Sequence, residues 1–274
     1  MPEPAIGEPD TDLAGAMSHV RWRIFAFLFG FGFVAYFQQK SITVAAERMM
    51  PELQLSQQQI GWIMQAFVIG YTLFQLPGGL LGQKLGARAA FTLISLVAFL
   101  AMLGTALAPA LASGSALFMA LIGAQLLLGL AQGGIFPISA GASASRFPPR
   151  HWAWVQGLQT MGLQAGAAMT PLLIAPLMTA FNWQQAIEFT TLPVLLLIAG
   201  WSWYARNTPR DHPGVLPAEL AEIGDRAGEQ IHRQPVLARL ATVLSSRHVP
   251  LLFLSYLCMN YTFYLLANWV FLYL

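Results

Sequence analysis

Several polar side chains stand inside segments of this sequence that are otherwise apolar enough to cross a lipid bilayer. In the run 22–46, a tyrosine and two amides precede a charged lysine: Tyr36, Gln38, Gln39 and Lys40. A lysine that faced lipid near the middle of a span would cost about 2.5–3.5 kcal/mol, so such groups turn toward protein or water. The alternative is that these residues lie near a span end and reach to the membrane surface.

Helical spacing indicates which residues share the polar face. At 100° per residue, Tyr36 and Gln39 fall on one side of a helix, and Lys40 adjoins that side. Gly32 and Thr43 extend the same stripe. We therefore expect the stripe to face inward and four aromatic residues to face lipid, namely Phe25, Phe29, Phe33 and Phe37.

Two later apolar segments carry amides at the same kind of spacing. Gln125 and Gln132 stand seven residues apart, which places them on one helix face. The next segment repeats the pattern at intervals of four residues, with Gln156, Thr160 and Gln164. The sequence therefore predicts three polar stripes on three different helices.

The chemistry that these side chains support is hydrogen bonding to a polar solute, because an amide both donates and accepts hydrogen bonds. Lys40 adds a positive charge that suits an anion. The alternative is that the amides only join helices, at about 0.6 kcal/mol per contact, and that the tyrosines only pack. The predicted substrate-binding set is Tyr36, Gln39, Lys40, Tyr71, Gln125, Gln132 and Gln164.

Other kinds of chemistry lack the residues they need. The sequence has no Gly-x-x-x-x-Gly-Lys-Ser/Thr loop for nucleotide phosphates and no nucleophile with a base and an orienting group. Met49, Met50 and Met64 have no histidine at ligand spacing, so we expect no metal and no cofactor. Basic residues are spread along the chain, which argues against nucleic-acid binding. We expect no enzyme.

The composition is that of a membrane protein. Of the 274 residues, 56% are hydrophobic and 9% are charged, with a mean hydropathy of +0.57. Soluble domains carry about 25% charged residues. The apolar runs predict an all-α membrane protein with six transmembrane helices over residues 21–205, arranged as two three-helix repeats. A seventh apolar run, 249–274, predicts a further and truncated span.

Two segments are expected to lie outside the membrane. Residues 1–20 predict a disordered cytoplasmic tail, and residues 206–248 predict a cytoplasmic linker with a short amphipathic helix that starts at Pro217. With the amino terminus inside, only Arg48 among the 14 basic residues lies outside, and Lys40 lies within the membrane. This asymmetry predicts a multi-pass protein of the inner (plasma) membrane with a cytoplasmic amino terminus.

Several motifs resemble those of the major facilitator superfamily. Residues 79–88 read Gly-Leu-Leu-Gly-Gln-Lys-Leu-Gly-Ala-Arg and resemble its signature loop between spans two and three. The family's anion:cation symporters, which transport organic anions, have motifs similar to residues 36–45, 70–79, 125–137 and 269–274. The resemblance covers about residues 20–274 and implies one half of a transporter with the start of span seven. It also implies a conformational latch at Gly79, Gln83, Lys84, Gly86 and Arg88.

The departures from this family fall on its charged positions. Its Asp-Arg pair in span one corresponds to Gln38 and Gln39, and its span-four arginine and glutamate correspond to Gln125 and Gln132. In the family, the arginines are implied to hold a substrate carboxylate and the carboxylates to carry the coupling proton. Amides do neither by charge. Gln83 also replaces the aspartate of the signature loop, so we expect a weaker latch.

The expected function is secondary active or facilitative transport of a small polar organic solute, such as an anion, by alternating access. The expected partners are the solute, the bilayer, and a missing carboxy-terminal six-helix half in the same chain or a second copy. The alternative is a half-transporter that does not transport and instead serves as a membrane sensor, scaffold or assembly partner.

Overall fold

The computed structural model describes residues 19–223, 245–246 and 248–273, and every regular element among them is helical. This confirms the all-α part of the fold prediction. The elements are α1 (Val20–Leu53), α2 (Gln57–Leu111), α3 (Gly114–Gly133), α4 (Ile135–Ala144), η2 (Pro149–His151), α5 (Trp152–Ala180), α6 (Trp183–Phe189), α7 (Leu192–Tyr204), η3 (Pro209–Asp211), α8 (Pro217–Ile223) and α10 (His248–Tyr273).

The chain forms two compact units, Met1–Gly228 and Glu229–Leu274. The first holds the bundle α1 to α8, and the second holds α10, an apolar helix of 26 residues formed by the seventh apolar run. Most of the expected tail and the middle of the expected linker, residues 1–18 and 224–244, lie outside the described residues. The described part of the linker contains α8, whose first residue is Pro217 as the sequence indicates.

Five segments of the described chain are long and apolar enough to cross a membrane. They are Val20–Leu53, Gln57–Leu111, Gly114–Ala144, Pro149–Ala180 and Trp183–Tyr204. The second has 55 residues. As one straight helix at 1.5 Å per residue it would be about 80 Å long, more than twice the roughly 30 Å of hydrocarbon in a bilayer.

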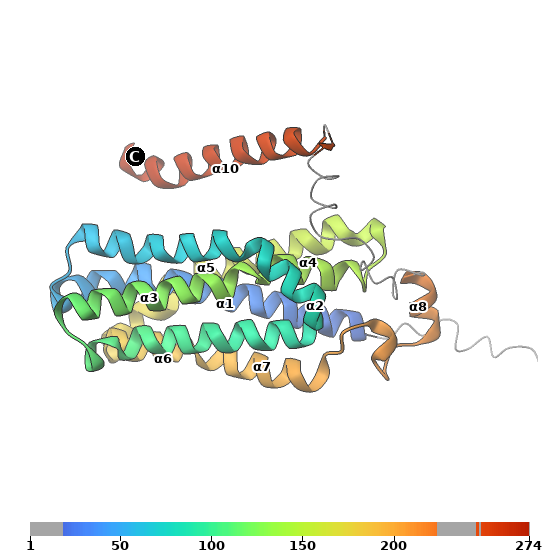
Figure 1. Ribbon diagram of the computed structural model, residues 1–274, viewed down its shortest axis with the longest axis horizontal. Helices are drawn as coiled ribbons and strands as arrows, with labels where there is room; N and C mark the ends of the chain where they lie inside the picture. Colours follow the sequence, from blue (N-terminus) through green and yellow to red (C-terminus); the bar gives the residue numbers. More distant parts are fainter. Residues whose placement is uncertain (1–18, 224–244, 247, 274) are drawn as a thin grey trace, which may run out of the picture. The chain divides into compact units, whose positions relative to one another are not determined.

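This long helix is interrupted at Gly86, within the break that the sequence indicates at residues 83–88. Gly86 has φ 78° and ψ 159°, a backbone conformation that is essentially restricted to glycine. Figure 1 shows α2 folded back on itself as two antiparallel arms. The sequence also predicts the start of α2, because Ser56 and Gln59 form the expected capping box.

Glycines let the main helices of the bundle approach closely. A Cβ atom on Gly129 of α3 would collide with the Phe67 carbonyl of α2, and one on Gly70 would collide with the Leu126 carbonyl. Gly166 of α5 lies in the same way against the Phe33 carbonyl of α1. Small residues allow such backbone contact between membrane helices. They therefore fix α2 against α3 and α1 against α5.

The contact between α1 and α5 corrects one prediction. Phe25 and Phe37 are buried, and Phe29 and Phe33 are half-buried, whereas the sequence pattern placed all four in lipid. Gly162 of α5 has no side chain and lies against the Phe29 ring. Because α5 has glycines where it faces this side of α1, the two helices approach closely, and the phenylalanines pack against protein.

Candidate functional site

The polar residues of the bundle interior form pairs between helices. Gln132 Nε2 of α3 donates to Gln38 Oε1 of α1 at 3.1 Å. The exposed fractions of these residues are 3% and 1%. Their hydrogen bond therefore joins two helices that are distant in sequence.

A second buried amide points toward α2. Gln125 is fully buried, and its Nε2 donates to Thr105 Oγ1 at 3.1 Å. Thr105 in turn donates to the Ala101 carbonyl at 3.0 Å. Gln125 and Gln132 thus share a face of α3, as the spacing predicts, but both side chains bond to neighbouring helices. Their direct contact with a solute stays a prediction.

A small cavity adjoins the amide pair. Its volume is about 10 Å³, and its lining includes Gln38, Ser95 and Gln132. Gln38 Nε2 is buried and has no hydrogen-bond partner among the described residues. A cavity of this size holds about one water molecule when polar groups surround it. The sequence analysis left Gln38 out of the predicted set, although the structure makes it the partner of Gln132.

The exposed face of α1 carries the other predicted residues of the first span. Lys40 and Thr43 are exposed, whereas Tyr36 and Gln39 are half-buried. On α5, which lies beside α1, Thr160 and Gln164 are exposed, and Gln159 is buried with its Nε2 2.7 Å from Ser143 Oγ. Lys40 and Gln164 are therefore accessible on neighbouring helices.

Tyr71 lies on the first arm of α2. Its ring is half-buried and stacks on Phe67, with the two ring centroids 5.9 Å apart. The Tyr71 carbonyl lies against Gly133 of α3, one residue after Gln132. Tyr71 is therefore close in the fold to the buried amide pair, on the glycine contact between α2 and α3.

The predicted latch residues surround the break in α2. Gln83 and Lys84 are exposed, and Gly79 packs against Pro137 of α4. The Arg88 backbone N–H donates to Asn207 Oδ1 at 3.0 Å, and Arg88 Nε donates to the Ser202 carbonyl at 3.1 Å. Asn207 therefore satisfies a backbone donor at the start of the second arm, where helices leave such groups unpaired.

Arg146, which the sequence analysis did not select, joins two segments at the same end of the bundle. It is buried and donates to the carbonyls of Ala142, Arg206 and Asn207 at 2.9, 2.7 and 3.3 Å, and to Ser145 Oγ at 3.1 Å. Burial lowers its pKa to about 10, so the guanidinium stays charged at pH 7. The positive charge suits the negative ends of helices α4 and α7.

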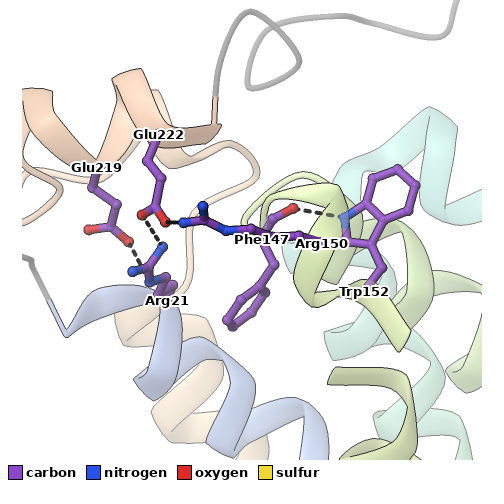
Figure 2. Close-up of polar contacts among 6 residues, drawn as sticks. All are labelled: Arg21, Phe147, Arg150, Trp152, Glu219 and Glu222. Carbon is purple, nitrogen blue, oxygen red and sulfur yellow. Dashed lines mark hydrogen bonds and ion pairs between the residues drawn. The ribbon is translucent and has the colours of Figure 1, made fainter. Parts of the chain in front are cut away.

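Helix α8 is attached to this end by ion pairs (Figure 2). Glu222 accepts from Arg21 at 2.7 Å and from Arg150 at 2.8 Å. Glu219, which is 1% exposed, lies 3.9 Å from Arg21. The hydrogen bond from Arg21 lowers the pKa of Glu222 below its usual value. Trp152 Nε1 also donates to the Phe147 carbonyl at 2.7 Å, which closes the turn before α5.

Basic residues thus gather at one end of the bundle, where the contacts of Arg21, Arg88 and Arg146 lie. Arg48 lies near the opposite end, where its guanidinium donates to the Met178 carbonyl at the end of α5. This distribution agrees with the charge asymmetry of the sequence.

Comparison with known proteins identifies the family. The family model described as Major Facilitator Superfamily matches residues 28–274. The chain belongs to the major facilitator superfamily. The resemblance to this superfamily found in the sequence is therefore confirmed.

Among its relatives in this superfamily, a probable sulfoacetate transporter of Cupriavidus necator is 29% identical over 72% of this chain and 44% of that protein. The hexuronate transporter of Bacillus subtilis is 27% identical over 90% of this chain and 54% of that protein. A probable galactarate/D-glucarate transporter of Escherichia coli K12 is 28% identical over 79% and 49%. The chain spans about half the length of these relatives, which are transporters and not enzymes.

Solved structures of the superfamily share the fold. The inward-open xylose transporter of E. coli matches with a TM-score of 0.62 at 13% identity, over 69% of this chain and 49% of that chain. A bacterial homologue of the human lysosomal transporter Spinster, in an inward-facing and unoccupied conformation, matches with a TM-score of 0.59 at 19% identity, over 74% and 47%.

Proposed function

We propose that this chain forms one half of a transporter that moves a small organic anion across the membrane by alternating access. Lys40 carries the proposal, because it places a positive charge within a helix long and apolar enough to span a membrane, exposed beside Tyr36 and Gln39. A lysine at this depth is costly unless it meets water or a negative charge. The relatives named for hexuronate, glucarate and sulfoacetate transport support an anionic solute.

The proposed binding surface combines exposed and buried residues. Lys40 would hold the anionic group of the solute, and Tyr36, Gln39 and Gln164 would bind its hydroxyl groups. Tyr71, Gln125 and Gln132 would set the polar interior behind this surface, with Gln38 as the partner of Gln132. The carboxy-terminal half, supplied by the same chain or by a second copy, would complete the site.

We also propose the topology that this function needs. Both arms of α2 would cross the membrane, so that residues 21–205 make six crossings and α10 begins a seventh. The end that carries Arg21, Arg88 and Arg146 would face the cytoplasm of the cell, because basic residues favour that side. The amino terminus at the start of α1 would then be cytoplasmic.

The amide pair suggests how such transport would be driven. Gln38 and Gln132 do not titrate, and they bond to each other where the family is implied to have carboxylates. We therefore propose that protons bound in this half do not drive transport. Facilitated diffusion, exchange, or coupling by the other half would move the solute.

The test is uptake of hexuronate, glucarate or sulfoacetate into proteoliposomes that contain the whole transporter. Lys40→Gln should raise the KM for the anion at least about tenfold, because hydrogen bonds to charged groups contribute about 1.5–3 kcal/mol. Arg210→Gln removes an exposed cation outside the proposed site and outside the latch, and it should leave KM unchanged. An equal effect of both substitutions would reject Lys40 as the anion contact.

The same vesicles test the coupling. Any dependence of uptake on a pH gradient should be the same in the wild type and in Glu188→Gln, which removes a half-buried carboxylate of α6. Gradient-driven accumulation that Glu188→Gln abolishes, or that Lys40→Gln abolishes even at saturating solute, would instead place the coupling proton on this half.

A further inference from the structure

A groove lies between the start of α1 and the end of α7, away from the amide pair. Its volume is about 540 Å³, within the roughly 300–1,000 Å³ of typical small-molecule sites. Its lining includes Arg23, Phe27, Leu197, Gly200, Trp203 and Tyr204.

Aromatic rings form the wall of the groove. Phe27 of α1 stacks on Tyr204 of α7, with ring centroids 6.2 Å apart and an interplanar angle of 29°. Gly200 contributes no side chain, and a Cβ atom there would lie 2.9 Å from the Phe27 ring. Trp203 is 80% exposed, so it lines the groove without closing it. The wall is therefore apolar and open along α7.

A cation stands at one end of this wall. The guanidinium carbon of Arg23 lies 5.9 Å from the centroid of the Tyr204 ring, which holds the charge by a cation–π contact. Arg206 follows two residues after Tyr204, and its guanidinium donates to the Trp203 and Ala205 carbonyls. Among the described residues that line the groove there is no carboxylate. Its charged end is therefore complementary to an anion.

The groove also has residues typical of the depth at which lipid headgroups meet protein. Tryptophan and tyrosine are enriched at the membrane surface, and α7 ends here with Trp203 and Tyr204. Toward the middle of α7 the groove continues to Leu197, and the adjacent Leu196 is 75% exposed. Basic pockets between membrane helices are known to bind anionic lipid headgroups. One end thus suits a phosphate and the other an acyl chain.

We propose that this groove binds one anionic phospholipid, with its phosphate at Arg23 and one acyl chain along Phe27, Leu197 and Gly200. A zwitterionic lipid fits the apolar wall equally well, but its headgroup has no net charge to match the arginine. The groove therefore selects lipids by headgroup.

The experiment measures lipid that stays bound to the full chain. The protein is purified from membranes in detergent, mixed with phosphatidylglycerol or phosphatidylcholine, and examined by native mass spectrometry. The wild type should retain phosphatidylglycerol in preference to phosphatidylcholine. Arg23→Gln should weaken phosphatidylglycerol binding about fivefold, the effect expected for one basic residue near a membrane surface. Lys84→Gln, which removes an exposed cation outside the groove, should change nothing.

A second pair of variants tests the groove itself. Ala26 lines the groove and is exposed, so Ala26→Trp should fill it and reduce the binding of both lipids. Ala89→Trp adds the same side chain at an exposed alanine outside the groove and should leave binding unchanged. Equal retention of the two lipids by the wild type would overturn the proposal. So would equal losses in Arg23→Gln and Lys84→Gln, or full retention in Ala26→Trp, which would mean that the lipid binds outside the groove.

Discussion

At the scale of single residues, the pair Gln38–Gln132 illustrates how an amide can occupy a buried position without charge. Each amide has donors and an acceptor, and one donor of Gln132 meets the acceptor of Gln38. The remaining Gln38 amide nitrogen adjoins the small cavity. The pair therefore keeps polarity between α1 and α3 at every pH in which the protein is folded.

A double-mutant cycle measures this contact. Gln132→Met should lower the free energy of unfolding by about 1 kcal/mol, because Gln38 keeps its buried amide without this donor. Gln38→Met should have a similar effect, and the double variant should be more stable than the sum of the single losses predicts. The coupling energy should be about 0.6 kcal/mol, the average for such bonds in membranes. Thermal unfolding in detergent gives these values, and strictly additive losses would show that the amides do not interact.

Sequence spacing predicts which residues share a helix face, but not which face is buried. Gln38 and Gln39 are adjacent and differ by 100° around α1, so either could have met Gln132. Which of the two meets Gln132 depends on how α1 is rotated. The glycines of α5 set that rotation, because they let the side of α1 that carries the phenylalanines pack against protein. That contact between distant segments has no periodic signal. For this reason the polar stripes were predicted, whereas the pair and the buried phenylalanines were not.

At the scale of elements, the break in α2 depends on one residue. Gly86→Ala would place a side chain at φ 78° and ψ 159° and against Asn207. We expect it to lower the free energy of unfolding by about 1–3 kcal/mol, the usual cost of such backbone strain, or by more if Asn207 is displaced. Gly61→Ala, in the first arm of α2 with open space around it, should instead stabilise the protein by up to about 1 kcal/mol. Thermal unfolding of both variants shows whether the loss of stability comes from backbone strain at Gly86 or from any glycine-to-alanine substitution in α2.

The attachment of α8 should depend on pH. The pKa of Glu222 is lowered in the folded protein, chiefly by its hydrogen bond from Arg21, so this contribution to stability is complete above the unfolded pKa. It is lost as the pH falls through the lower, folded pKa, and α8 should then detach. Hydrogen exchange of residues 217–223 at neutral and acidic pH measures this. Glu222→Gln should remove most of the pH dependence, and unchanged dependence in that variant would assign it to another group.

At the scale of the whole molecule, the loop at Gly86 belongs to the bundle that we propose to be one half of a transporter. The contacts of Arg88 lie within the bundle: its side chain donates to the Ser202 carbonyl, and its backbone N–H donates to Asn207 Oδ1. Gln83 and Lys84 remain exposed, and the proposed second half could contact them. The fold class, the break in α2 and the family were predictable from apolar runs and motifs. The contacts that hold the loop were not, because they come from residues about 115 positions later in the chain.

Restoring a carboxylate in this loop should change the balance between conformations. Gln83→Asp adds the charge that the family's latch is implied to use, so we expect a larger outward-open population in the whole transporter. The measurement is labelling of a cysteine at Ser113, an exposed position between α2 and α3, in a Cys258→Ser background. Gln58→Asp, at an exposed glutamine near the start of α2, is the control. No difference between the two aspartate variants would argue against the latch.

The arginine at position 146 has a consequence for how this sequence can evolve. Three of its acceptors are main-chain carbonyls, which any amino acid supplies. The hydrogen bonds at positions 142 and 206 therefore do not depend on the side chains there, although Ala142 is buried and has little room to grow. No other side chain than arginine offers a fork of donors to both segments. Among homologues in which this arginine connects the same two segments, it should be invariant while the residues that accept from it vary. Covariation between pairs of positions would not detect such a contact, because one of the two positions never changes.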